Sequence, residues 1–122
     1  MAEKKTTLVI GASDNPARYA YQAVNWLRSK GHPVIALGKA VCKVGDVSVE
    51  TEPHPIPGID TVTLYINPRH QQPYYDYILS LHPKRIIFNP GTENPELETL
   101  AKANGIQPLR ACTLVMLSTG QY

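Results

Sequence analysis

The chain has 122 residues, 43% of them hydrophobic, which suits one compact domain over residues 1–122 and leaves no room for a second core. The formal net charge is +2 at pH 7 and the basic residues are scattered, so neither a nucleic-acid-binding stripe nor a membrane-binding face is indicated. Residues 1–7 are polar and the longest apolar run, Leu114–Leu117, is too short to span a bilayer, so we expect a cytosolic protein.

The first predicted elements form a strand–helix–strand unit. Thr7–Ile10 is a short run that is apolar on both faces, as is typical of a buried parallel strand. A helix follows, with Asn15 as its predicted cap, Pro16 at its first helical position and Gly31 past its end. Pro33–Leu37 is the second strand, and we expect the crossover between the two strands to be right-handed.

Residues 40–58 have no single interpretation. The stretch VCKVGDVSVE is compatible with a short strand or with a hairpin around Gly45 and Asp46. The stretch TEPHPIPG that follows is a loop broken by prolines.

Strands and helices alternate again in the second half of the chain. Thr61–Ile66 has the pattern of a buried strand, and Gln71–Leu81 has helical spacing and ends before a proline. Arg85–Phe88 is the next strand. Asn94-Pro95 opens a last helix and Gly105 closes it. The charges of this segment suit a helix, since its glutamates lie near the positive end and its lysine near the negative end.

Ile106–Leu109 completes the series as a fifth short strand, and the tail ACTLVMLSTGQY has no clear pattern. Such alternation predicts a parallel sheet covered by helices on both faces. We therefore expect an α/β, Rossmann-like, doubly wound fold with three layers and about five strands. Ligands of these folds bind outside the carboxyl ends of the strands, where the strand order reverses.

The loop after the first strand resembles a dinucleotide fingerprint only in part. Against G-x-G-x-x-G, Gly11 fits the first glycine, but Ser13 and Pro16 occupy the other two positions, which disfavours the usual pose of NAD. A Walker A loop is also incomplete. The helix end still offers free N–H groups and roughly +0.5 of partial charge to a phosphate, with Ser13, Asn15 and Arg18 available to assist.

The loop after the second strand indicates a phosphorylated ribose. NAD-binding proteins place Asp or Glu there to accept hydrogen bonds from the ribose hydroxyls, whereas this chain has Lys39. A cation at this position favours NADP, which has a 2′-phosphate, or coenzyme A, which has a 3′-phosphate. The incomplete glycine pattern argues against NADP.

These residues carry a family resemblance that covers the chain from about Thr7 to about Leu117. The stretches VIGASDNPARYA, KGHPVIALGK, DTVTLYINP and IIFNPGTENPEL, with a late cysteine in ACTLVM, resemble the small CoA-binding proteins of bacteria. Those single domains are similar to the CoA-binding domain of the succinyl-CoA synthetase α subunit. The histidine that the synthetase phosphorylates lies outside that domain, so the resemblance implies CoA or acyl-CoA binding without catalysis.

The resemblance also implies a set of binding residues. It places Gly11, Ala12, Ser13 and Arg18 at the pyrophosphate, Leu37, Gly38 and Lys39 around the adenosine and its phosphate, Ile66, Asn67 and Pro68 beside the pantetheine, and Asn89 and Gly91 near the rest of the ligand. Each also has a plainer interpretation: Ser13 and Asn15 as helix caps, Arg18 and Lys39 as solvated side chains, and Asn89-Pro90-Gly91 as a turn.

The sequence predicts neither a metal site nor a catalytic pair. Cys42 and Cys112 are far apart without a CxxC pair, so we expect free thiols in a reducing compartment, and Cys112 is more typical of a buried apolar position than of a nucleophile. The four histidines are isolated from one another and lack zinc-ligand spacing.

Two alternatives to a CoA-binding domain remain open. The first is an NADP-type nucleotide-binding or acyl-CoA-processing enzyme subunit that needs a partner chain to complete its site. The second is a ligand-free scaffold that binds protein partners. For the proposed carrier of CoA we expect a small-molecule ligand, no nucleic acid and no membrane, and the sequence does not identify a protein partner.

Overall fold

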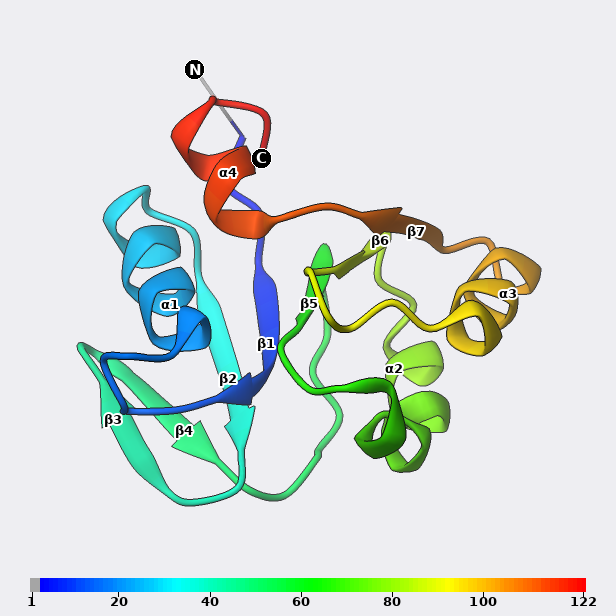
Figure 1. Ribbon diagram of the computed structural model, residues 1–122, viewed down its shortest axis with the longest axis horizontal. Coiled ribbons are helices and arrows are strands. Elements are labelled where there is room, and N and C mark those ends of the chain that lie inside the picture. The colour runs from blue at the N-terminus through cyan, green and yellow to red at the C-terminus, as the bar shows by residue number, and fades with distance from the viewer. Residues whose placement is uncertain (1–2) are drawn as a thin grey trace.

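The computed structural model describes residues 3–122 as a seven-stranded sheet with helices on both faces (Figure 1). The strands are β1 (Thr7–Ala12), β2 (Val34–Gly38), β3 (Cys42–Val44), β4 (Val47–Glu50), β5 (Thr61–Leu64), β6 (Arg85–Phe88) and β7 (Gln107–Arg110). The helices are α1 (Tyr19–Ser29), α2 (Tyr75–Leu81), α3 (Pro95–Ala103) and α4 (Thr113–Ser118), with short 3₁₀ turns η1 (Pro68–His70) and η2 (Gln72–Tyr74).

The sheet is parallel except at one edge. Its strand order is β3-β4-β2-β1-β5-β6-β7, and only the β3–β4 pair is antiparallel. The chain leaves the central strand β1 for β2 on one side and later returns to β5 on the other side. The order therefore reverses at β1, which is where the fold class places ligands.

The predicted α/β fold with a mostly parallel sheet is confirmed, but the expected number of about five strands is wrong. The additional strands β3 and β4 form a hairpin that turns at Gly45-Asp46, so the hairpin interpretation of this stretch is the correct one. The hairpin is held against α1 by the Arg28–Asp46 ion pair, whose closest N–O distance is 2.8 Å. Strands of three and four residues are too short for a reliable alternation pattern.

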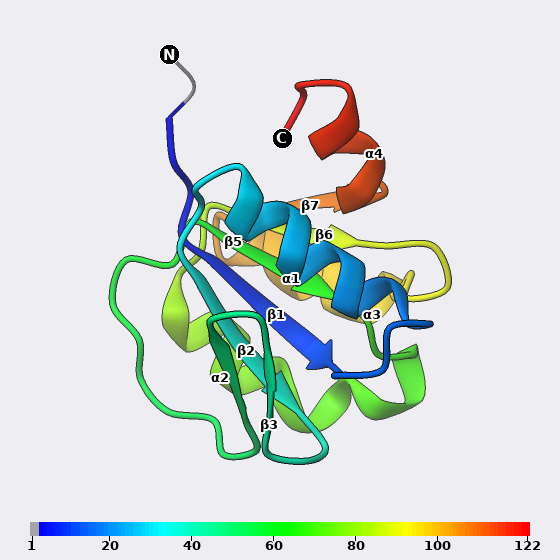
Figure 2. The same ribbon diagram turned by 90° about the vertical axis from the view of Figure 1, so that its left-hand side faces the viewer.

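Two apolar clusters form the core, one on each face of the sheet. On one face Val9 and Ala36 of the sheet pack with Leu27 of α1 and Leu117 of α4. On the other face a larger cluster, centred on Phe88, receives side chains from α2 and α3. Figure 2 shows α1 and α2 on opposite sides of the sheet, so the predicted three-layer arrangement is present. The tail that had no clear sequence pattern forms α4 on the α1 side.

The predicted start of the first helix is wrong. We expected Asn15 as the cap and Pro16 in the first turn, but α1 begins at Tyr19 with Arg18 as its N-cap residue. The Asn15 side chain instead accepts a hydrogen bond from the Ala17 amide at 3.0 Å, and the Asn15 carbonyl accepts one from the Arg18 amide at 3.0 Å. These local bonds form a separate turn before the helix, which is a common alternative for asparagine.

The other two predicted helices are found with small changes. The helix expected from Gln71 begins at Tyr75, because the proline-containing turns η1 and η2 precede it, and it ends at Leu81 as predicted. The predicted start of α3 at Asn94-Pro95 is confirmed: the Asn94 side chain caps the helix by accepting hydrogen bonds from the amides of Glu96 at 3.1 Å and Leu97 at 3.3 Å. No helix within residues 3–122 has the length and apolar character needed to cross a membrane.

A buried histidine joins the two ends of the described chain at the amino ends of the strands. His32 is 6% exposed, and its Nδ1 accepts a hydrogen bond from the Lys5 amide at 2.9 Å. Its ring packs edge-on against Tyr122 at a centroid distance of 5.0 Å, and the Arg85 guanidinium lies 4.5 Å from the centre of the same Tyr122 ring. Burial lowers the pKa of His32, and the nearby charges of Lys4, Lys5 and Arg85 lower it further.

We predict that protonation of His32 destabilises the fold. Because its pKa is lower in the folded than in the unfolded chain, the stabilisation is complete above the unfolded value of about 6.5 and is lost as the pH falls below it. Urea unfolding at about pH 7.5 and about pH 5.5 measures this loss, and His32→Gln should reduce it. The matched control His82→Asn, at an exposed position with φ 49°, should keep the wild-type pH dependence. An unchanged pH dependence in His32→Gln would contradict the prediction.

Candidate functional site

A cleft of about 770 Å³ opens at the carboxyl ends of the central strands. Four connections border it: those that follow β1, β2, β5 and β6. It is lined by Gly11, Ala12, Ser13, Asp14, Ala17, Arg18, Tyr19, Ala20, Gly38, Lys39, Ala40, Cys42, Tyr65, Ile66, Asn67, His70, Tyr74, Pro90, Gly91 and Thr92. Its position at the reversal of the strand order is the one expected for a ligand in this fold.

The wall of the cleft depends on the close approach of three backbone segments. Gly11 has φ 96°, and a Cβ there would lie 2.8 Å from the Tyr65 carbonyl carbon and 2.8 Å from Cγ2 of Ile66. A Cβ at Gly38 would lie only 2.3 Å from the Ala12 carbonyl oxygen. The two glycines are therefore required by packing between strand ends, whatever the cleft binds.

The amino end of α1 faces the cleft, since Tyr19 and Ala20 of its first turn line it. The first N–H groups of a helix have no partner within the helix, and the helix dipole adds partial positive charge at this end. Ser13 lies in the loop between β1 and α1, and its hydroxyl accepts a hydrogen bond from the Asn15 amide at 3.1 Å. The arrangement suits an anion.

Two cations of the cleft have no acidic partner. Among residues 3–122, the ion pairs engage Arg28, Lys84 and Arg110 and a histidine, but neither Arg18 nor Lys39. Both side chains line the cleft, where Asp14 is the one acidic residue among the lining groups. The excess of positive over negative formal charge among the lining groups favours an anionic ligand.

The opposite wall of the cleft is formed by the loops after β5 and β6. Asn67 caps the turn η1 by accepting a hydrogen bond from the Arg69 amide at 3.0 Å, which places Ile66, Asn67 and His70 at the cleft. On the second loop Gly91 has φ 90° and no atom within 4 Å of a built Cβ. This wall carries uncharged polar groups and aromatic side chains rather than fixed cations.

Most of the predicted binding residues come together in this cleft. Those that line it are Gly11, Ala12, Ser13, Arg18, Gly38, Lys39, Ile66, Asn67 and Gly91. They come from four loops that are far apart in sequence. Their contacts with a ligand remain predictions.

Four predicted residues do not line the cleft. Leu37 is 1% exposed, because its side chain lies on the sheet face that α2 and α3 cover and packs in the core there. Asn15 is engaged in the turn before α1, and Pro68 begins η1 with its ring exposed. These three side chains are therefore absent from the lining of the cleft.

The fourth, Asn89, has a structural role that its position in a turn motif did not predict. It is 2% exposed, and its amide donates to the Thr63 hydroxyl at 2.6 Å and to the Leu64 carbonyl at 2.8 Å. Its oxygen accepts a hydrogen bond from the Thr113 amide at 2.9 Å, at the start of α4. Asn89 therefore joins β5, the end of β6 and α4.

Sequence reasoning missed several residues that line the cleft, among them Tyr19, Cys42, Tyr65, His70 and Thr92. Tyr65 and His70 flank the stretch INPR, so their position along the chain could have identified them. Burial raises the pKa of the Tyr65 phenol well above its usual value, and its buried hydroxyl has no hydrogen-bond partner of normal geometry among residues 3–122. Cys42 gave no signal because the hairpin that carries it was not assigned.

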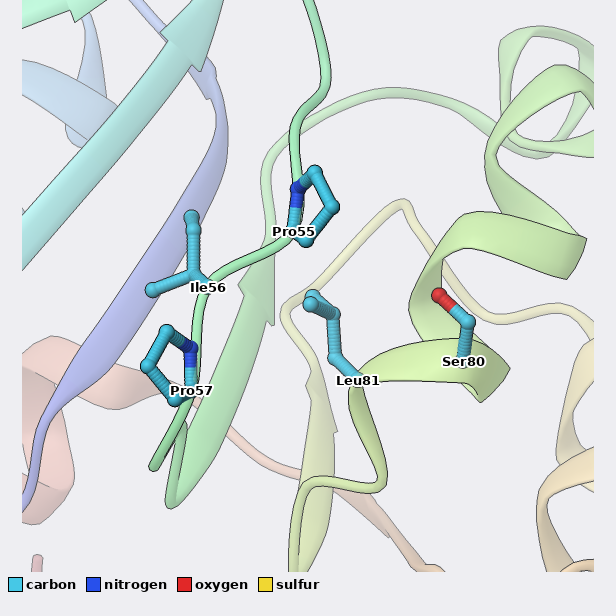
Figure 3. A pocket seen from close by; sticks show the side chains of 5 residues that line it. All are labelled: Pro55, Ile56, Pro57, Ser80 and Leu81. Carbon is cyan, nitrogen blue, oxygen red and sulfur yellow. The ribbon is translucent and has the colours of Figure 1, made fainter.

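A smaller hollow of about 290 Å³ lies between the proline-rich loop before β5 and the end of α2. Figure 3 shows its lining residues Pro55, Ile56, Pro57, Ser80 and Leu81. None of them is charged, and Ile56 and Leu81 also pack against the core. The hollow therefore lacks the groups that a phosphate requires.

The comparisons with known proteins identify the family of the chain. A family model described as "CoA binding domain" matches residues 5–118. A crystal structure of an uncharacterized protein has 51% sequence identity and a TM-score of 0.96, over 99% of this chain and 100% of that chain. No curated protein matches the sequence.

Two more distant structures share the fold. A protein from Thermus thermophilus has 21% identity and a TM-score of 0.82, over 98% of this chain and 91% of that chain. A hypothetical protein from Pyrococcus horikoshii OT3 has 22% identity and a TM-score of 0.85, over 95% of this chain and 83% of that chain. At these identities the likeness concerns the fold alone.

We predict that Gly38→Ala destabilises the protein by more than about 2 kcal/mol, because the new Cβ would separate β2 from the end of β1. The control Gly58→Ala has the opposite properties: a positive φ of 75°, which Gly38 lacks, and no atom within 4 Å of the new Cβ, so it should cost only about 1 kcal/mol of backbone strain. Urea unfolding of both variants measures the difference. Equal losses of unfolding free energy in the two variants would show that β2 can move away from the Ala12 carbonyl at little cost.

Proposed function

Because the chain belongs to the CoA-binding domain family, we propose that it binds coenzyme A or an acyl-CoA in the cleft at the carboxyl ends of β1, β2, β5 and β6. One observation carries the proposal: the amino end of α1 lines the same cleft as Arg18 and Lys39, two cations that form no ion pair within residues 3–122. CoA has a diphosphate and a separate 3′-phosphate, so it offers negative charge at two positions. The cleft offers positive charge at two positions as well.

The proposed orientation follows the charges. The diphosphate lies at the first turn of α1, within reach of Ser13 and Arg18. The adenosine 3′-phosphate lies at Lys39, on the connection after β2. The uncharged pantetheine arm then extends along the opposite wall, past Ile66 and Gly91.

The strength of such contacts is sufficient for useful affinity. A hydrogen bond to a charged phosphate contributes roughly 1.5–3 kcal/mol, and micromolar binding needs about 8 kcal/mol. Arg18 and Lys39 are exposed, so solvent screens their contributions toward the lower end of this range. Three or four phosphate contacts together with burial of the pantetheine arm reach the required total.

We further propose that the domain performs no chemistry of its own. A nucleophile in the cleft would need an adjacent base. Within residues 3–122, neither Ser13 nor Cys42 forms a hydrogen bond with a histidine or carboxylate side chain. The Ser13 hydroxyl is engaged by the Asn15 amide.

Thermal unfolding tests the proposed function directly. CoA at about 100 times its dissociation constant should stabilise the protein by about 2.7 kcal/mol, which raises the melting temperature by roughly 10 °C for a chain of this size. ATP, which lacks the 3′-phosphate and the pantetheine arm, is the control nucleotide and should give a smaller shift. No shift with CoA at millimolar concentration would overturn the proposal.

We predict that Lys39 recognises the 3′-phosphate. Wild-type protein should bind CoA about tenfold more tightly than dephospho-CoA in calorimetry, a difference of about 1.4 kcal/mol, and Lys39→Met should lose this preference. Lys43→Met is the matched control, because Lys43 is exposed on the neighbouring strand β3 and does not line the cleft. Equal affinity of the wild type for the two ligands would remove Lys39 from this role.

We predict that CoA protects Cys42 from alkylation. Both cysteines are partly buried, but only Cys42 lines the cleft. The rate of maleimide modification, followed by mass spectrometry of peptides, should fall severalfold at Cys42 when CoA is bound and should stay unchanged at Cys112. Protection of Cys112 alone would place the ligand elsewhere.

A further inference from the structure

The loop between β5 and α2 contains a fully buried glutamine, Gln71. Gln71 is 0% exposed, although it lies between the exposed turns η1 and η2. A buried amide is costly unless its donors and acceptor are satisfied. Its hydrogen bonds therefore show what this residue holds together.

The amide of Gln71 bridges the two loops that form one wall of the cleft. Its Nε2 donates to the Ile66 carbonyl at 3.0 Å and to the Thr92 carbonyl at 2.8 Å. Ile66 follows β5 and Thr92 follows β6, and both line the cleft. One nitrogen thus uses both of its hydrogens to fix the separation of two cleft loops.

The orientation of this amide is determined by its partners. Both carbonyls can only accept, so the nitrogen of Gln71 must face them. Its Oε1 accepts a hydrogen bond from the Asn94 amide nitrogen at 2.9 Å. The same Asn94 nitrogen donates to the Tyr75 hydroxyl at 2.8 Å. The network therefore extends from the cleft to the first residue of α2 and the cap of α3.

Packing alone does not account for this arrangement. An apolar side chain of the same length would fill the space, but it would leave the Ile66 and Thr92 carbonyls and one Asn94 hydrogen without partners. The Thr92 loop has its own internal bonds, because both the amide and the hydroxyl of Thr92 donate to the Asn89 carbonyl. These bonds stay within the β6 loop, whereas Gln71 joins the β6 loop to the β5 loop.

We propose that Gln71 is a positioning residue that presets the pantetheine side of the cleft. It holds the β5 and β6 loops at one separation in the free protein, so that binding of the arm does not have to order them. This inference rests on the proposed function. It assigns the effect of Gln71 to the arm of CoA and not to its nucleotide part, because none of its hydrogen bonds reaches the loops after β1 or β2.

The test compares CoA with adenosine 3′,5′-bisphosphate, which has the adenosine, the 3′-phosphate and the first 5′-phosphate of CoA but neither its second 5′-phosphate nor its pantetheine arm. In Gln71→Met we expect the affinity for CoA to fall about tenfold in calorimetry, while the affinity for the bisphosphate changes less than about twofold. A second variant, Asn94→Asp, keeps the cap of α3 but removes the donor to Gln71, and should lower the CoA affinity by a smaller factor. It keeps the test available if Gln71→Met does not fold.

The core variant Ile78→Val is the matched control. Ile78 is fully buried on α2 and does not line the cleft, so this variant should lower the melting temperature without changing the ratio of the two affinities. If Gln71→Met weakens both ligands equally, or neither, the positioning role is wrong while CoA binding stands. If the wild type binds neither ligand, the proposed function itself fails.

Discussion

The close contact of strand ends around β1 is the constraint on which the rest of the structure depends. Gly11 and Gly38 let the carboxyl ends of β1, β2 and β5 approach at distances that no side chain would allow. The connection after β1 then forms a tight turn before α1 instead of extending the helix backward. The amino end of α1 stands beside the cleft, which Tyr19 and Ala20 of its first turn line. In the proposed function, backbone geometry supplies the phosphate site here and the side chains add selectivity.

The two walls of the cleft differ in how they are built. The β1–β2 wall carries Arg18 and Lys39, which are exposed and can adjust to a charged ligand. The β5–β6 wall has no fixed cation, and its loops are held from behind by the buried amides of Gln71, Asn89 and Asn94. Electrostatic attraction acts over a distance and tolerates motion, whereas a neutral arm needs a preformed surface. This division of roles suits a ligand that is highly charged at one end and nearly uncharged along the rest.

Much of the fold and the position of the site could be predicted from the sequence, because alternating apolar strands and helices leave few possible topologies. The loops after β1 and β2 were identified from this pattern and residues of the loops after β5 and β6 from the family resemblance, and all four loops border the cleft. The features that the sequence did not predict correctly depend on side-chain hydrogen bonds or on very short strands. Asn15 forms its own turn, Asn89 faces the core and the β3–β4 hairpin is too short for periodicity. The hydrogen bonds of Gln71 have no sequence signature, since the carbonyls that accept them belong to Ile66 and Thr92, which are separated from Gln71 by 5 and 21 positions along the chain.

The contact between His32, Lys5 and Tyr122 places both ends of the described chain on the rim of the sheet that is remote from the cleft (Figure 1). Both ends of the described chain thus lie on one side of the domain, and the cleft lies on the other. A protein fused at either end would lie on the side of the domain opposite the cleft and would not cover the cleft.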